Sequence, residues 1–143
     1  MSYDLRINEG DLVIASDADL DRVEDNEKLV QDILKMLMTP VGSNVFFPWY
    51  GSLLPGTMIG QVIDETFRRT AIEQQINNSL EMIQKLQRQQ AADGQRVTPG
   101  ELLAAIQSVE VNRNVVDPTY FTIHVKVLTK AFTTAVASLD VTL

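Results

Sequence analysis

The chain has 143 residues with no cysteine, a single histidine and a formal net charge of -7. A domain of this length can bury a core without covalent or metal support, and the lack of cysteine excludes disulfides and thiolate metal sites. No apolar run reaches the ~18 residues of a spanning helix and no basic-then-apolar leader opens the chain, so we expect a soluble cytoplasmic product without a membrane partner.

The first part of the chain combines strand-like alternation with most of the negative charge. Leucine and isoleucine alternate with polar residues on both sides of Asn8, Glu9 and Gly10, which predicts a β-hairpin. Residues 1–34 carry ten acidic and three basic side chains, whereas the other 109 residues carry nine of each. An acidic arm on a neutral body disfavours nucleic acid and favours a basic protein surface as partner; the alternative is a face that is simply solvated.

The acidic connection of residues 17–26 starts like a calcium loop. Asp17, Asp19 and Asp21 alternate as the first ligands of such a loop would. Arg22 and Lys28, however, stand where the loop needs a turn-forming glycine and a bidentate glutamate. We therefore expect a polar, acidic turn here and no metal site, and since no glycine-rich phosphate loop is present either, no cofactor.

A first helix is predicted after this connection, with Asn26 as its cap and with Pro40 and Gly42 ending it. Its apolar stripe recurs at three- and four-residue intervals. The stripe consists of Leu29, Val30, Ile33, Leu34, Leu37 and Met38.

A second, long helix is expected from about Thr57 to Ala92. Its apolar stripe takes a five-residue step between Phe67 and Ile72, so we expect a bend, a break or a change of packing partner near residues 68–71. Thr98 and Pro99 then predict the cap and first turn of a short helix over residues 100–107.

The end of the chain alternates like a sheet with one buried side, with strands expected at residues 109–116, 120–129 and 135–143. The predicted fold class is α+β: an N-terminal β-hairpin, a core helix, a long bent helix and a short helix packed on a small C-terminal antiparallel sheet. The whole chain, 1–143, is expected to be one domain. It comprises the acidic hairpin and connection (1–25), a helical part (26–108) and the sheet (109–143).

The sequence offers little catalytic chemistry. His124 lies in the middle of a predicted strand with no supporting nucleophile motif. Glycoside hydrolysis needs two facing carboxyls; Asp64 and Glu65 are adjacent and diverge, while Glu65 and Glu73 are ~12 Å apart along a helix. A pair brought together from distant segments stays open, but we expect no enzyme and no small-molecule substrate.

Residues 39–56 concentrate bulky side chains in irregular backbone. This segment holds three prolines, three glycines and four of the nine aromatic residues, namely Phe46, Phe47, Trp49 and Tyr50. Aromatic side chains are favoured at interfaces because they bury a large area with little rotamer entropy to lose. We expect some of the four to fill the gap between helix and sheet and at least one to contact a neighbour; the alternative is that all four are core.

The stretch from about residue 5 to residue 56 resembles the W-like baseplate wedge family of contractile-tailed phages, which includes the wedge subunit of type VI secretion baseplates. The similar positions are Gln31, Leu37, Thr39, Pro40, Gly42, Pro48, Tyr50 and Gly51. The resemblance implies a structural subunit located in the virion tail baseplate, and in the host cytoplasm during assembly. It implies other wedge proteins and the tail tube and sheath subunits as partners.

Two further interface predictions depend on this resemblance and on the final strand. Family members carry Glu-Pro-Arg where the last helix passes into the sheet; Glu110 and Arg113 match its charged ends, without the proline and with one residue more between them. The last strand, with Leu139, Val141 and Leu143 on one face, is expected to accept or add a strand of a neighbour. The alternatives are a peptidoglycan-degrading tail lysozyme and an assembly adaptor or chaperone.

Overall fold

A three-stranded antiparallel sheet organises the computed structural model, which describes residues 2–54 and 64–142. Its strands lie in the order β5-β6-β7, with β5 at Leu103–Arg113, β6 at Tyr120–Thr129 and β7 at Thr134–Thr142. Alternate residues of β6 and β7 are buried, as a sheet with one covered face requires. The predicted α+β class is confirmed, and the β6 boundaries match those expected.

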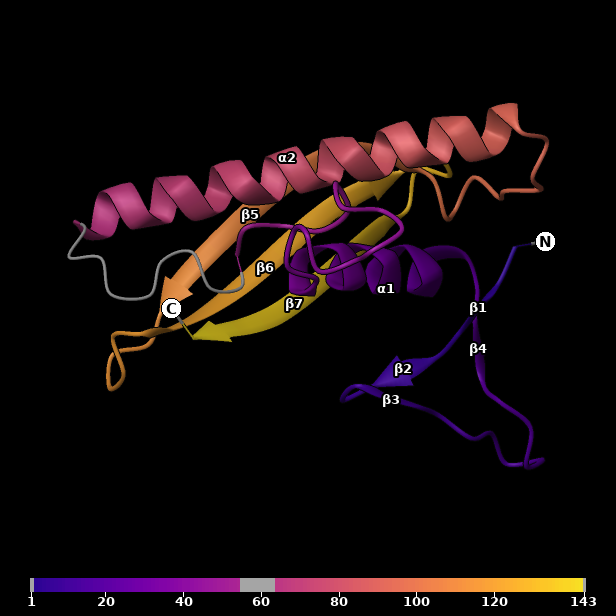
Figure 1. Cartoon of the computed structure of the whole chain (residues 1–143), viewed down its shortest axis with the longest axis horizontal. Helices are drawn as coiled ribbons and strands as arrows, with labels where there is room; N and C mark the ends of the chain where they lie inside the picture. Colours follow the sequence, from indigo (N-terminus) through magenta and orange to yellow (C-terminus); the bar gives the residue numbers. More distant parts are fainter. Residues whose placement is uncertain (1, 55–63, 143) are drawn as a thin grey trace.

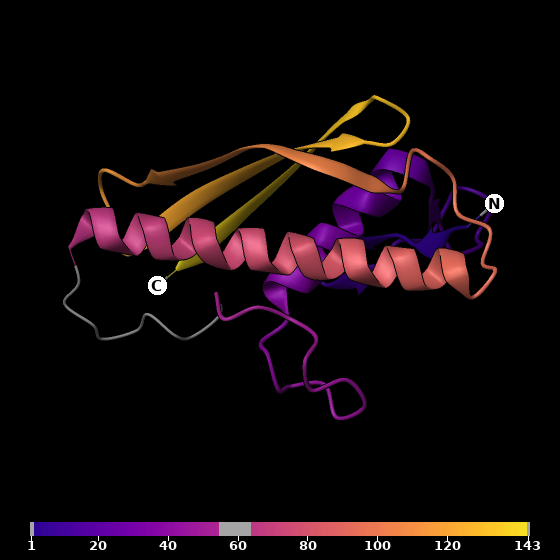
Figure 2. The same cartoon turned by 90° about the horizontal axis from the view of Figure 1, so that it is seen from above.

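Two helices pack on the sheet: α1, Asp25–Met38, mainly along β7, and α2, Glu65–Ala92, mainly along β5 (Figures 1 and 2). They share one core with the buried side of the sheet. Among its fully buried members are Leu29, Ile33, Leu37, Ile72, Ile76, Leu80, Ile123, Val125 and Val127. Burial of these side chains, at roughly 1.5–3 kcal/mol each, is the main force that joins the layers.

Two details of the first helix differ from the prediction. Asn26 is not the cap: the helix begins at Asp25, and the Asn26 side chain instead accepts a hydrogen bond of 3.0 Å from the Thr133 hydroxyl. Met36, rather than Met38, belongs to the buried face. The β6–β7 turn contacts Asn26, and the Gly51 N–H of the following loop contacts the Met36 sulfur at 3.3 Å; the helical period alone does not reveal either contact.

The second helix runs without interruption from Glu65 to Ala92, so neither the expected break nor the expected bend is present in this range, and the third alternative, a change of packing partner, stays a prediction (Figure 1). Phe67 is 62% exposed, and the buried face starts only at Ile72. The five-residue step from Phe67 to Ile72 therefore joins an exposed residue to the first buried one and does not interrupt the buried face of the helix. The predicted start near Thr57 lies outside the described residues.

The predicted short helix over residues 100–107 is also wrong, since β5 begins at Leu103. Thr98, Pro99 and Gly100 form a turn, in which the Glu101 N–H donates to the Thr98 carbonyl at 3.2 Å. Pairing with β6 supplies cross-strand partners for the next residues, including Ile106 opposite Val127, with two register irregularities. Long-range pairing thus overrides a local helix signal.

Residues 2–23 form an N-terminal arm of short paired segments. β1 (Asp4–Leu5) pairs with β4 (Arg22–Val23), and β2 (Ile7–Asn8) pairs with β3 (Asp11–Leu12), which confirms the hairpin around Glu9 and Gly10. The acidic connection is more ordered than a polar linker. Ala15 N–H donates to the Asp19 carbonyl at 2.8 Å, and Ile14 pairs with Leu20, so this segment makes a second turn.

Candidate functional site

The segment that follows α1 is an ordered loop, closed at its neck by backbone hydrogen bonds. The Ser52 N–H donates to the Thr39 carbonyl at 2.8 Å, and the Val41 N–H donates to the Ser52 carbonyl at 3.1 Å. The Ser52 hydroxyl also donates to the last turn of α1, at the Leu37 carbonyl, over 2.6 Å. We call residues 39–54 the aromatic loop.

The tip of the aromatic loop is held by short-range contacts. The Asn44 side chain accepts hydrogen bonds from the N–H groups of Phe46 and Phe47 at 3.0 and 3.1 Å. Gly42 N–H donates to the Pro48 carbonyl at 3.0 Å. These bonds give a loop without regular secondary structure a defined backbone path.

The bulky side chains of this loop point largely into solvent. Phe46, Phe47 and Trp49 are 86%, 53% and 46% exposed. The Trp49 ring makes edge contacts with Phe47, at 5.7 Å between centroids, and with Tyr50, at 6.3 Å. The alternative that all four aromatics are core is thereby excluded, and only the half-buried Tyr50 packs against the core.

A shallow groove of about 390 Å³ separates the aromatic loop from the C-terminal half of α2. Phe47, Trp49 and Tyr50 line one side, and Leu86 and Gln90 line the other. Exposed Val41, Val45 and Leu53 add apolar surface to the same loop. These three were not among the predicted contact residues, although their place on either side of the aromatics was the available signal. The loop thus gathers exposed apolar side chains of the kind that mark protein contact sites.

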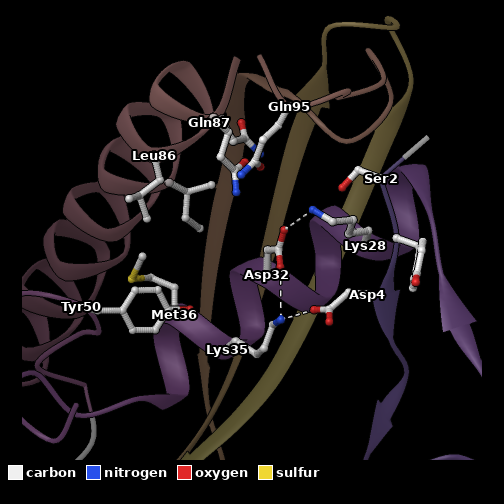
Figure 3. Close-up of a pocket in the computed structure, with 13 residues that line it drawn as sticks. Ser2, Asp4, Lys28, Asp32, Lys35, Met36, Tyr50, Leu86, Gln87 and Gln95 are labelled. Carbon is white, nitrogen blue, oxygen red and sulfur yellow. Dashed lines mark hydrogen bonds and ion pairs between the residues drawn. The ribbon is translucent and has the colours of Figure 1, made fainter. Parts of the chain in front are cut away.

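Tyr50 links this surface to a polar cleft of about 380 Å³ between α1, the arm and the end of α2 (Figure 3). Burial raises the pKa of the Tyr50 hydroxyl. To the right of Tyr50 in Figure 3, Lys28 and Lys35 alternate with Asp32 and Asp4, with Lys28–Asp32 at 3.1 Å and Lys35–Asp32 at 3.4 Å. Burial opposes the charge on Asp4, but its contacts with Lys35, the Leu5 N–H and Gln31 together outweigh burial and lower the pKa of that carboxyl. The cleft is therefore a charge-balanced seam that docks the arm.

Gln31 is the main polar link between α1 and the arm. Its buried amide accepts from the Ile7 N–H at 2.9 Å and donates to the Leu5 carbonyl at 2.8 Å. The sequence analysis noted Gln31 only through the resemblance. A glutamine on the buried face of an amphipathic helix was the signal that it pairs with backbone groups.

Replacement of Gln31 by leucine should undock the arm. The Ile7 N–H and Leu5 carbonyl would lose their partners, at a cost of ~1–3 kcal/mol in the free energy of unfolding. Urea unfolding and amide exchange of the arm measure both effects. Gln84→Leu, which removes an exposed hydrogen bond to the Ala104 carbonyl, is the matched control. Unchanged exchange in the arm would contradict this role.

Glu101 is a buried carboxylate at the turn before β5. One oxygen accepts from the Thr98 N–H at 3.0 Å; the other, Oε2, is buried without a hydrogen-bond partner among the described residues. Burial raises the pKa of Glu101 above its ordinary 4.5, against the effect of the Thr98 bond. The charged form is therefore disfavoured in the folded state.

Burial of the Glu101 carboxylate predicts that the free energy of unfolding depends on pH. Because the folded pKa of Glu101 lies above the unfolded one, stability falls as the pH rises from about 4.5 through the folded pKa, and stays lower above it. Glu101→Gln keeps an acceptor for Thr98 and removes the charge. We expect the variant to be more stable than wild type at pH 7, with the difference shrinking at pH 4, in urea unfolding. A variant less stable at pH 7 would contradict this.

The other predicted interface residues are spread over the sheet. Glu110 is exposed on β5, opposite His124 on β6, and Arg113 forms an ion pair of 2.9 Å with Glu65 at the start of α2. Leu139 is a core residue and Val141 packs against the core; Leu143 lies outside the described residues. The structure does not bring these residues together with the aromatic loop, and their interface role stays a prediction.

The candidate carboxylates and the histidine take part in surface contacts. Glu73 pairs with Arg69 at 3.2 Å on α2, and His124 Nδ1 lies 2.7 Å from the Ser138 hydroxyl on β7. Within residues 2–54 and 64–142, no cluster of three acidic or histidine side chains suits a metal ion.

No model of a known protein family matches the chain, and no curated protein matches it. None of the helices in the described part of the chain is long and apolar enough to cross a membrane.

Proposed function

We propose that this chain is a structural, non-enzymatic subunit of the baseplate wedge of a contractile phage tail or a related injection machine, and that its aromatic loop binds a neighbouring wedge protein. The observation that carries the binding role is the exposure of Phe46, Phe47 and Trp49 on a loop with a closed neck. Rigid, exposed aromatics lose little entropy on burial at an interface. The resemblance of residues 5–56 supports the choice of assembly.

A second contact in this proposal is strand addition at β7, an edge of the sheet that would meet a sheath or wedge strand. Because Leu139 belongs to the core, the edge would offer its backbone rather than this side chain, and removal of residues 139–143 would damage the fold. Val136, which is exposed on β7, allows a milder test. We expect Val136→Lys to reduce sheath assembly in tail preparations without loss of folding; normal sheath would argue against strand addition here.

The assembly itself is tested by quantifying this protein in purified tails by mass spectrometry against the tube and sheath subunits. A fixed, small ratio that survives washing is expected of a wedge subunit. Absence from particles despite expression would overturn the proposal.

A further inference from the structure

The N-terminal arm projects from the body below α1 (Figure 1) and carries exposed apolar side chains. Ile7 pairs with Leu12 and Ile14 pairs with Leu20, so each pair shares a face of the arm. Leu12 and Ile14 are two residues apart in one extended segment and therefore point the same way. The four side chains are 39% to 69% exposed.

This face is held in position although the arm has no second layer to cover it. Strand pairs of two residues are marginal alone. The arm is anchored at its root by Gln31 and by Arg6, which pairs with Asp21 at 2.6 Å and with Glu27 of α1 at 2.7 Å. Because the arm is already fixed on the body, binding of a partner costs little further conformational entropy of the arm.

The apolar face continues into a groove on the body. A hollow of about 380 Å³ lies between the arm, α1 and β7, and Ile7 lines it together with Val30, Leu34 and Ala135. Ile7 thus belongs both to the face and to the groove. A bound segment can lie along the arm and enter the hollow at its root.

The charge on the arm selects the occupant. Glu9, Asp11, Asp17 and Asp19 are exposed, and no ion pair joins them to a base in the described part of the chain. A second copy would bring the same acidic arm, and the body beyond residue 34 is neutral, so self-association lacks a positive counterpart. Nucleic acid is repelled for the same reason.

We infer that the N-terminal arm is a docking surface for a basic, amphipathic protein segment, which buries apolar side chains on Ile7, Leu12, Ile14 and Leu20 and places Lys or Arg beside the surrounding carboxylates. This surface is separate from the aromatic loop, and its test does not depend on which assembly the protein belongs to.

The experiment titrates the full chain with a labelled peptide of about ten residues in which Val and Lys alternate, long enough to span the arm at ~3.3 Å per residue. A Ser/Lys peptide lacks the apolar face, and a Val/Glu peptide reverses the charge. We expect the Val/Lys peptide to bind at least about tenfold more tightly than either, to weaken with added salt, and to shift amide signals of the arm.

The matched variants are Leu12→Ser with Ile14→Ser on the arm and Val115→Ser with Val116→Ser at the β5–β6 turn, where the apolar residues are more exposed, at 100% and 92% against 47% and 69%. The arm variant should bind the Val/Lys peptide about tenfold more weakly, and the turn variant should bind like wild type. Binding unaffected by the arm variant, equal binding of the Val/Glu peptide, or no binding at all would overturn the inference. So would a dimer that Ile14→Ser disrupts, because the occupant would then be a second copy.

Discussion

Replacement of Phe46, Phe47 and Trp49 by serine should remove the protein from assembled tails while leaving it folded. These side chains are 86%, 53% and 46% exposed, so their loss costs the isolated chain little. At an interface, each truncated aromatic anchor typically costs ~2–4 kcal/mol, or roughly 30- to 1,000-fold in affinity. We therefore expect the protein in purified tails to fall below about a tenth of the wild-type ratio.

Two controls make this prediction specific. Urea unfolding of the triple variant should match the wild type, which separates lost binding from lost folding. Val115→Ser with Val116→Ser removes apolar surface that is more exposed still, at the β5–β6 turn, and should leave incorporation unchanged. Wild-type incorporation of the triple variant would show that the aromatic loop is not the contact.

Replacement of Gly51 by alanine should produce the largest loss of stability among the loop variants. Gly51 has φ +120°, and a Cβ there would lie 2.3 Å from the Thr39 carbonyl oxygen. That oxygen also accepts the Ser52 N–H bond that closes the loop, so the neck must open to relieve the clash. We expect a loss of ~2–4 kcal/mol in the free energy of unfolding, measured in urea.

Gly42→Ala is the matched control for this strain. Gly42 has φ +85°, but a Cβ there would meet nothing within 4 Å. The alanine then costs only the strain of a left-handed backbone conformation, ~1 kcal/mol in the free energy of unfolding. A Gly51→Ala variant no less stable than Gly42→Ala would contradict the packing argument. Because Gly51 N–H also contacts the Met36 sulfur at 3.3 Å, the Gly51 variant should in addition perturb the end of α1.

In the aromatic loop, some features of the candidate site could be predicted from the sequence and others could not. Prolines and glycines around four aromatics predicted irregular backbone with bulky side chains, and Pro40 and Gly42 marked the end of α1 correctly. Which aromatics are exposed was left open, because exposure depends on where the neck bonds between Thr39 and Ser52 aim the loop relative to α2. No local pattern encodes that direction.

The sequence by itself determined the α+β class, the N-terminal hairpin, the extent of α1 within about two residues and the strand β6. These elements carry their own periodicity and turn residues, and such local signals act before any tertiary contact forms. The tertiary structure alone decided three other features. Pairing with β6 turned residues 103–107 into strand, the sheet left Phe67 of a straight α2 uncovered, and Gln31 docked the arm on α1. Each depends on a partner far away in the sequence, and the free energy of that contact outweighs the local preference.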